Sequence, residues 1–163
     1  MEPTPKLCMR LAEPADLDEL VRARLMVLRA ANGLAPQAPL PQVEAETRRY
    51  FEEGLVTGSF AAVLVLAGGE LAATGAVSFY EVMPTCHTPT GKKAYIMNMY
   101  TAPAWRRRGL ATRVLDRLVR ECRARGVDTI TLEATAMGRP VYERYGFVPM
   151  ECEMELPAGP DEN

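Results

Sequence analysis

Residues 94–134 constrain the fold more than any other part of the chain, because strand, turn, helix and strand patterns follow one another there. The run AYIMNMYT at residues 94–101 is apolar and aromatic, which predicts a strand. Apolar side chains then recur at helical spacing over residues 110–122, with charged side chains on the opposite face. TITLEA at residues 129–134 predicts a second strand. A strand, a helix and a strand in this order pair the two strands in parallel through a right-handed crossover.

A second pattern, a glycine pair between two apolar runs, predicts an antiparallel hairpin. SFAAVLVLA and ELAATGAVSFYEV flank Gly68-Gly69, which is typical of a two-residue hairpin turn. A parallel pair and an antiparallel pair together predict one mixed sheet with helices on its faces. The other predicted elements are a strand at 8–12, a helix at 13–31, a helix at 43–55 closed by Gly54, a short helix at 138–145 and a final strand at 147–156.

Length and charge limit the class of protein. The 163 residues predict a single domain over 1–163, with a core over about residues 7–156 and a flexible tail at 157–163. The chain has 19 Lys and Arg against 21 Asp and Glu, a net charge of −2. This balance argues against a nucleic-acid or membrane-surface partner.

Cysteine and histidine usage argues against a metal site. The four cysteines are scattered and form no Cys-x-x-Cys motif, so neither a zinc site nor a disulfide framework is indicated. The one histidine, His87, excludes a His-rich metal site. The N-terminus shows no signal-peptide pattern, and no apolar run is long enough to span a bilayer. We therefore expect a cytoplasmic protein without a metal.

The stretch PAWRRRGLAT at residues 103–112 predicts an anion-binding turn. It follows a predicted strand and opens a predicted helix, whose first backbone N–H groups lack intrahelical acceptors and carry partial positive charge. Gly109 and Ala111 leave room for a ligand to approach those groups. Arg106, Arg107 and Arg108 add charge at the rim. The alternative is a solvated basic turn, and neither the Rossmann nor the P-loop pattern is present.

These residues resemble the acyl-CoA signature of the GNAT N-acetyltransferase superfamily, Q/R-x-x-G-x-G/A. The matching positions are Arg106, Gly109 and Ala111, and "GRPVYERYGF" is similar to the family's L-Y-x-x-x-G-F segment. The resemblance spans about residues 8–156. It implies an α+β, three-layer α/β/α fold whose mixed, mostly antiparallel sheet contains a splayed parallel strand pair.

The resemblance also implies a donor and the residues that bind it. The diphosphate of acetyl-CoA would rest on the backbone N–H groups of residues 107–112, and the pantetheine arm would lie against residues 99–101 like an added strand. A backbone N–H near Met99 or Tyr100 would polarise the thioester carbonyl. The implied donor-binding residues are Met99, Tyr100, Thr101, Arg106, Arg107, Arg108, Gly109, Leu110, Ala111 and Thr112.

Tyr142 matches the family's usual general acid, because a phenol can reprotonate the departing CoA thiolate. Packing of Tyr142 on the sheet is the alternative interpretation. Asn98 is a candidate contact to the substrate or a strand residue satisfied where the sheet opens. The strand at residues 94–101 holds no acid, so the general base stays open. Within the strand, the only candidates are Tyr95, Asn98 and Tyr100. Outside it, the candidates are Glu81, Glu133, His87 and a water molecule relayed to a distant acid.

The leading hypothesis is direct transfer of an acetyl group from acetyl-CoA to a primary amine of a small molecule or peptide. The helical pair over residues 16–54 and its proline-rich loop would cover the acceptor side. A non-catalytic acyl-CoA-binding module is the alternative, and nucleic-acid binding through the arginines is disfavoured by the net charge. A homodimer is left open.

Overall fold

The computed structural model describes residues 5–159 and divides into two compact units. The first unit ends at Glu133 and holds the sheet, and the second begins at Ala134 and holds the last helix. The single domain over 1–163 stays a prediction. The predicted tail at 157–163 lies partly outside the described residues, which end at Gly159.

The first unit is built on a five-stranded mixed sheet. Its strands are β1 (Leu7–Leu11), β2 (Phe60–Ala67), β3 (Glu70–Glu81), β4 (Lys92–Thr101) and β5 (Thr129–Leu132). They lie in the order β1-β2-β3-β4-β5, with every pair antiparallel except β4 and β5, which are parallel. The mixed, mostly antiparallel sheet predicted from the sequence is therefore confirmed. Gly68 and Gly69 both adopt positive φ, as the tight hairpin turn requires.

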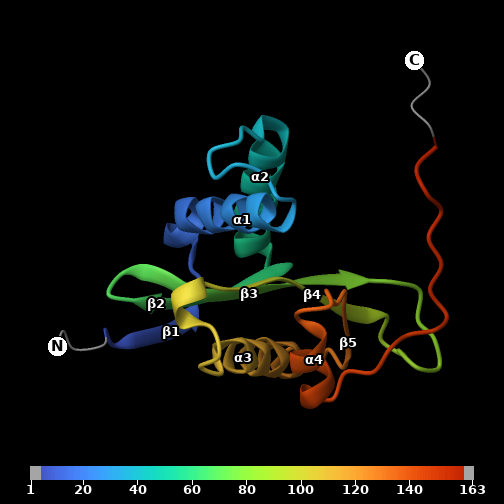
Figure 1. Ribbon diagram of the computed structural model, residues 1–163. Coiled ribbons are helices and arrows are strands. Elements are labelled where there is room, and N and C mark those ends of the chain that lie inside the picture. The colour runs from blue at the N-terminus through green and yellow to red at the C-terminus, as the bar shows by residue number, and fades with distance from the viewer. Residues whose placement is uncertain (1–4, 160–163) are drawn as a thin grey trace. The chain divides into compact units, whose positions relative to one another are not determined.

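Helices cover both faces of this sheet, as Figure 1 shows for the first unit. On one face lie α1 (Leu17–Ala31), preceded by a 3-10 turn (Pro14–Asp16), and α2 (Pro41–Thr57). On the other face lies α3 (Leu110–Ala124), which follows a second 3-10 turn (Pro103–Trp105). The α/β/α layering is thus confirmed. Among residues 5–159, no helix has both the length and the apolar character needed to cross a bilayer.

The apolar stripe of α3 packs on the sheet as its spacing predicts. Its side chains Leu110, Val114, Leu115, Leu118, Val119 and Cys122 are buried. A Cβ added at Gly75 of β3 would lie 2.5 Å from the Met99 sulfur and 2.8 Å from a methyl of Val114. Only a glycine admits this approach, so β4 and the first half of α3 are held tightly together. This packing fixes the position of β4 relative to α3, and with it the ends of the turn that joins them.

The prediction that Gly54 closes the second helix is wrong. The helix α2 continues through Gly54 to Thr57 and ends at Gly58, which adopts φ +79°. Gly54 is buried, and a Cβ there would lie 2.5 Å from the Cβ of Phe60. This glycine therefore serves close helix–strand packing, whereas Gly58 supplies the left-handed cap.

In the second unit, the predicted short helix is confirmed as α4 (Arg139–Tyr145), but the predicted strand at 147–156 is wrong. Apolar Met150, Cys152 and Met154 alternate with glutamates there, yet the segment has no ladder partner among the described residues. Met154 is 99% exposed. An alternating pattern predicts which side chains share a face of a strand. A strand also needs a partner for its backbone hydrogen bonds, and Pro149 removes one of the donors.

Candidate active site

The sheet opens between β4 and β5, as the family resemblance implied. Residues 93–96 of β4 pair with all four residues of β5. Beyond Ile96, residues 97–101 of β4 have no β5 partner, although they still follow β3 on the other side. This open edge of β4 offers backbone donors and acceptors to an extended ligand, which is the requirement for strand addition.

A β-bulge at Asn98 marks the point where the sheet opens. Ala76 of β3 opposes Met97. Thr74, two residues earlier in β3, opposes Tyr100, which is three residues later in β4. The extra β4 residue is accommodated at Asn98, whose φ of +58° is one of two positive values outside glycine among the described residues. Positive φ in a non-glycine residue is a form of local strain that concentrates at functional sites.

Arg24 is a candidate site residue that the sequence pattern did not single out, because it contacts the candidate Asn98. It lies in α1, and its Nη1 donates a hydrogen bond of 3.1 Å to the Oδ1 of Asn98. Burial lowers the pKa of the Arg24 guanidinium. The only signal in the sequence was a cation on the otherwise apolar stripe of a helix. The contact spans 74 residues, so its partner was not visible.

The turn from β4 into α3 presents a row of free backbone donors. The N–H groups of residues 107–112 donate to no acceptor in the part of the chain that the structure describes. Arg107 and Gly109 adopt φ +61° and +73°, and such left-handed residues aim neighbouring N–H groups into a shared concavity. The first turn of α3 has no side-chain cap. The predicted anion cradle is therefore geometrically available, with most donors from the backbone.

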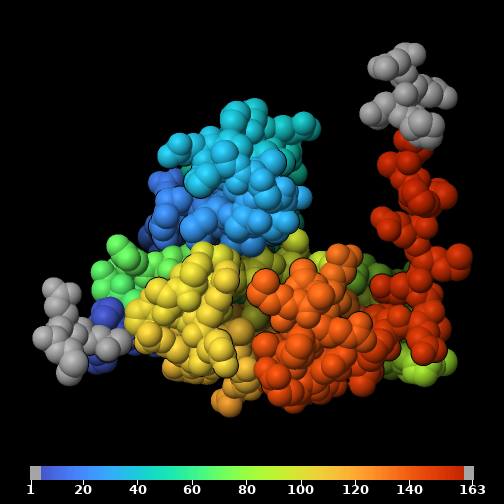
Figure 2. All heavy atoms as spheres, viewed as in Figure 1, coloured from blue at the N-terminus to red at the C-terminus, as the bar shows by residue number. Residues whose placement is uncertain are grey.

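The three arginines form a rim around this turn. Arg106 donates from Nε to the Thr101 carbonyl at 3.3 Å, which fastens the turn to the end of β4. The guanidinium of Arg108 lies 4.8 Å from the ring centre of Trp105. All three arginines are exposed, and Figure 2 shows the segment around residues 100–112, in yellow, open on the surface of the molecule.

Tyr142 belongs to the second unit, where it is a buried residue of α4. Its ring meets that of Phe147 edge to face at 6.2 Å. Burial raises the pKa of the Tyr142 phenol. The phenol is therefore held in its protonated form, which a general acid requires.

The three candidate bases outside β4 differ in their positions relative to the sheet. Glu81 pairs with Lys92 at the first residue of β4. That position is six residues from Asn98, or about 20 Å along a strand. His87 is exposed in the loop between β3 and β4. Glu133 directly follows Leu132, the β5 residue that pairs with Ile96 where the sheet opens. Glu133 is thus the only one of the three that the register brings to the opening.

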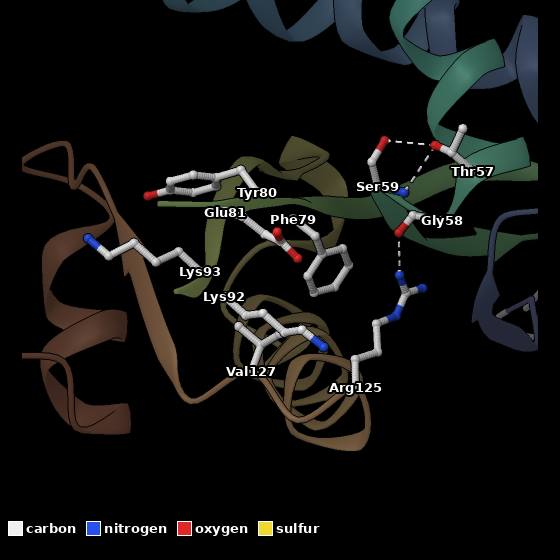
Figure 3. Close-up of a pocket in the computed structure, with 10 residues that line it drawn as sticks. All are labelled: Thr57, Gly58, Ser59, Phe79, Tyr80, Glu81, Lys92, Lys93, Arg125 and Val127. Atoms are coloured by element: carbon white, nitrogen blue, oxygen red, sulfur yellow. Dashed lines mark hydrogen bonds between the residues drawn. The ribbon is translucent and has the colours of Figure 1, made fainter. Parts of the chain in front are cut away.

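A cavity of about 400 Å³ lies elsewhere in the first unit (Figure 3). Its lining residues are Thr57, Gly58, Ser59, Phe79, Tyr80, Glu81, Lys92, Lys93, Arg125 and Val127. Arg125 closes one wall, donating to the Gly58 carbonyl and lying 4.3 Å above the Phe79 ring. The cavity meets the start of β4 and the end of α3, whereas the free N–H groups lie at the opposite ends of both elements. It is therefore separate from the predicted donor site.

The chain is similar to known acetyltransferases in both sequence and fold. The profile of the Acetyltransferase (GNAT) family matches residues 28–147. The chain is 33% identical over 147 residues to glucosamine 6-phosphate N-acetyltransferase 1 of Oryza sativa subsp. japonica, covering 88% of this chain and 84% of the rice protein.

Solved structures agree in fold. A predicted acetyltransferase from Clostridium acetobutylicum, crystallised with acetyl-CoA, is 36% identical with a TM-score of 0.85, covering 93% of this chain and 96% of that one. A GCN5-related N-acetyltransferase from Ralstonia eutropha JMP134 is 29% identical with a TM-score of 0.80, covering 94% and 99%. The residues matched by the family profile include all of β4 and α3.

Proposed function

Because the chain belongs to the Acetyltransferase (GNAT) family and is an acetyl-CoA-dependent N-acetyltransferase, we propose that it transfers the acetyl group directly to a primary amine of a small molecule or peptide. One observation carries the proposal: six consecutive free backbone N–H groups, at residues 107–112, continue from the open edge of β4. That arrangement suits a ligand with a diphosphate at one end and an amide-bearing arm. The reaction is proposed to run in the cytoplasm without a nucleic-acid or membrane partner.

In this proposal the cradle and the strand edge divide the work of donor binding. Backbone N–H groups of residues 107–112, at the positive end of α3, bind the diphosphate. Arg106, Arg107 and Arg108 screen its charge from the rim. Backbone groups of Met99, Tyr100 and Thr101 pair with the amides of the pantetheine arm, which directs the thioester toward the bulge at Asn98.

The proposed chemistry needs one hydrogen-bond donor to the thioester carbonyl and one general acid. A backbone N–H on the open edge of β4 donates to the thioester oxygen and stabilises the negative charge that develops there. The attacking nitrogen forms the amide bond as the carbon–sulfur bond breaks, and the Tyr142 phenol gives its proton to the sulfur. The proton that the nitrogen sheds as it becomes an amide then restores the phenol, directly or through water. Asn98, with its oxygen bound to Arg24, retains its amide N–H groups as donors toward the acceptor.

We assign the base to Glu133, directly or through one water molecule. A primary amine with a pKa near ~10 is mostly protonated at neutral pH and must lose a proton before it attacks. Glu133 follows the last β5 residue paired with β4, so it stands at the mouth of the opening. It is exposed, which leaves it free to pass the proton to solvent.

The test is acetyl-CoA-dependent thiol release over a panel of primary amines, with the product followed by mass spectrometry. We expect at least one amine to release CoA thiol in equal amount to an N-acetylated product. A tertiary amine of similar shape serves as the matched control and should release none. Acetyl-CoA binding with no release for any amine would contradict the proposal and favour the non-catalytic binding module.

A further inference from the structure

Arg24 is a half-buried arginine whose charge no carboxylate neutralises among the described residues. Eight other arginines form ion pairs: Arg10, Arg22, Arg48, Arg49, Arg117, Arg120, Arg125 and Arg139. Arg24 forms none within residues 5–159, and its one hydrogen bond goes to the neutral amide of Asn98. Unlike the exposed arginines of the α3 turn, it is half-buried.

Within the part of the chain that the structure describes, most of the guanidinium's donors have no acceptor. The group carries five N–H bonds in a planar fork and stays protonated in proteins. One bond to an amide oxygen neither neutralises the charge nor occupies the fork. A partly buried, uncompensated charge is unfavourable, and burial lowers the pKa of Arg24 accordingly. A carboxylate or phosphate group matches the geometry of the fork and would supply the missing negative charge.

The position of Arg24 tells which reactant would bring that charge. Arg24 reaches Asn98 from α1, and α1 packs on the face of the sheet that carries Ala76. The free N–H groups assigned to the CoA diphosphate belong to the turn before α3 and to its first residues, and α3 lies on the opposite face (Figure 1). The group bound at Arg24 therefore approaches the bulge from the α1 side, where the donor's phosphates are not bound.

We propose that Arg24 binds an oxyanion group of the acceptor, so that the preferred acceptor is a primary amine that also bears a carboxylate or a phosphate. The inference rests on the proposed function, because it takes Asn98 to lie beside the reacting thioester. Asn98 then has a second role, since its Oδ1 fixes the orientation of the Arg24 fork. The amine is delivered to the thioester by the anchoring of its anionic group.

The kinetic test compares acceptors in matched pairs. One pair is an amino acid and its amide, and the other is an amino-sugar phosphate and the amino sugar, so the pairs distinguish carboxylate from phosphate. Wild-type protein should prefer the anionic member of at least one pair by about tenfold or more in kcat/KM. In Arg24→Gln that ratio should fall to about 1, and Arg24→Lys should restore part of it. Arg22→Gln, on an exposed neighbour paired with Glu19, is the control and should keep the wild-type ratio.

The alternatives give different results. If Arg24 only positions Asn98, Arg24→Gln lowers kcat/KM equally for both members of a pair. The ratio of their kcat/KM values then persists, which overturns the inference. A wild-type protein that acetylates neutral amines as well as anionic ones overturns it too, while the proposed function stands. A rise in the Kd of acetyl-CoA in Arg24→Gln assigns the residue to the donor and also overturns the inference.

A binding experiment keeps the inference testable if no amine in the panel reacts, an outcome that would count against the proposed function alone. Acetate or inorganic phosphate is titrated into protein saturated with CoA, and the Arg24 Nε–H and Asn98 side-chain amide signals are followed by NMR. We expect at least one anion to shift both signals in wild type and to leave the Asn98 signal unshifted in Arg24→Gln. Absence of any shift in wild type would overturn the inference.

Discussion

Replacing Gly109 with glutamate is expected to abolish acetyl-CoA binding. The site has room for the side chain, because a Cβ at Gly109 meets nothing within 4 Å. The new carboxylate would accept hydrogen bonds from the free N–H groups and repel the diphosphate. We expect the affinity for acetyl-CoA to fall by at least about 100-fold, or ~3 kcal/mol. Isothermal titration measures this loss.

Gly126→Glu is the matched control for that substitution. Gly109 and Gly126 adopt φ +73° and +71°, both with open space, at opposite ends of α3. Each glutamate therefore imposes a similar backbone cost, of order 1–2 kcal/mol, on folding. Similar losses of thermal stability are expected, but only Gly109→Glu should lose acetyl-CoA. Tight binding of acetyl-CoA by Gly109→Glu, or an equal loss of acetyl-CoA affinity in both variants, would contradict the cradle assignment.

Tyr142→Phe is expected to lower turnover by roughly 10²- to 10⁴-fold, the usual contribution of a positioned acid. The Kd of acetyl-CoA should stay nearly unchanged, since in the proposed mechanism the phenol acts on the departing sulfur and not on the bound nucleotide. Tyr145→Phe, three residues further in α4, is the control and should stay within about twofold of wild type. Steady-state kinetics and titration with acetyl-CoA separate the two effects.

The pH dependence of turnover tests the proposed acid role of Tyr142 independently. Burial raises the pKa of its phenol, so the protonated acid persists above the ordinary value near ~10. Turnover by the wild type should therefore rise with pH as the amine loses its proton, and decline only above about pH 10. The phenylalanine variant should lack this decline. A wild-type rate that falls near pH 8, or full turnover in the variant, would remove Tyr142 from the acid role.

Local sequence patterns predicted the sheet, and they pointed to the free N–H groups of residues 107–112 that form the proposed cradle, because each depends on neighbouring residues. The Gly68-Gly69 turn, the apolar stripe of α3 and the parallel β4–β5 pair all follow from spacing along the chain. The errors arose where tertiary packing decides. Gly54 looks like a helix stop but packs on Phe60. The alternating segment at 147–156 looks like a strand, yet pattern alone cannot supply a pairing partner.

The proposed acceptor side of the site could be predicted less well from the sequence. Asn98 was a candidate, but nothing in AYIMNMYT predicts a bulge with positive φ. The extra residue is recognised only when the register of β4 is compared with that of β3. Its contact with Arg24 joins residues far apart in the chain, and a single arginine in an apolar stripe is commonly a solvated helix residue. The proposed donor half of the site is thus local in sequence, whereas the proposed acceptor half is made by the fold.

The central claim, that the β4–α3 turn holds the diphosphate, is tested most directly by backbone amide NMR during titration with CoA. We expect the largest amide shifts at residues 107–112, with a second set along the open edge of β4 at residues 97–101. Amides around the cavity of Figure 3, at Lys92, Lys93 and Arg125, should stay unchanged. Shifts concentrated at that cavity, with residues 107–112 unperturbed, would contradict the account.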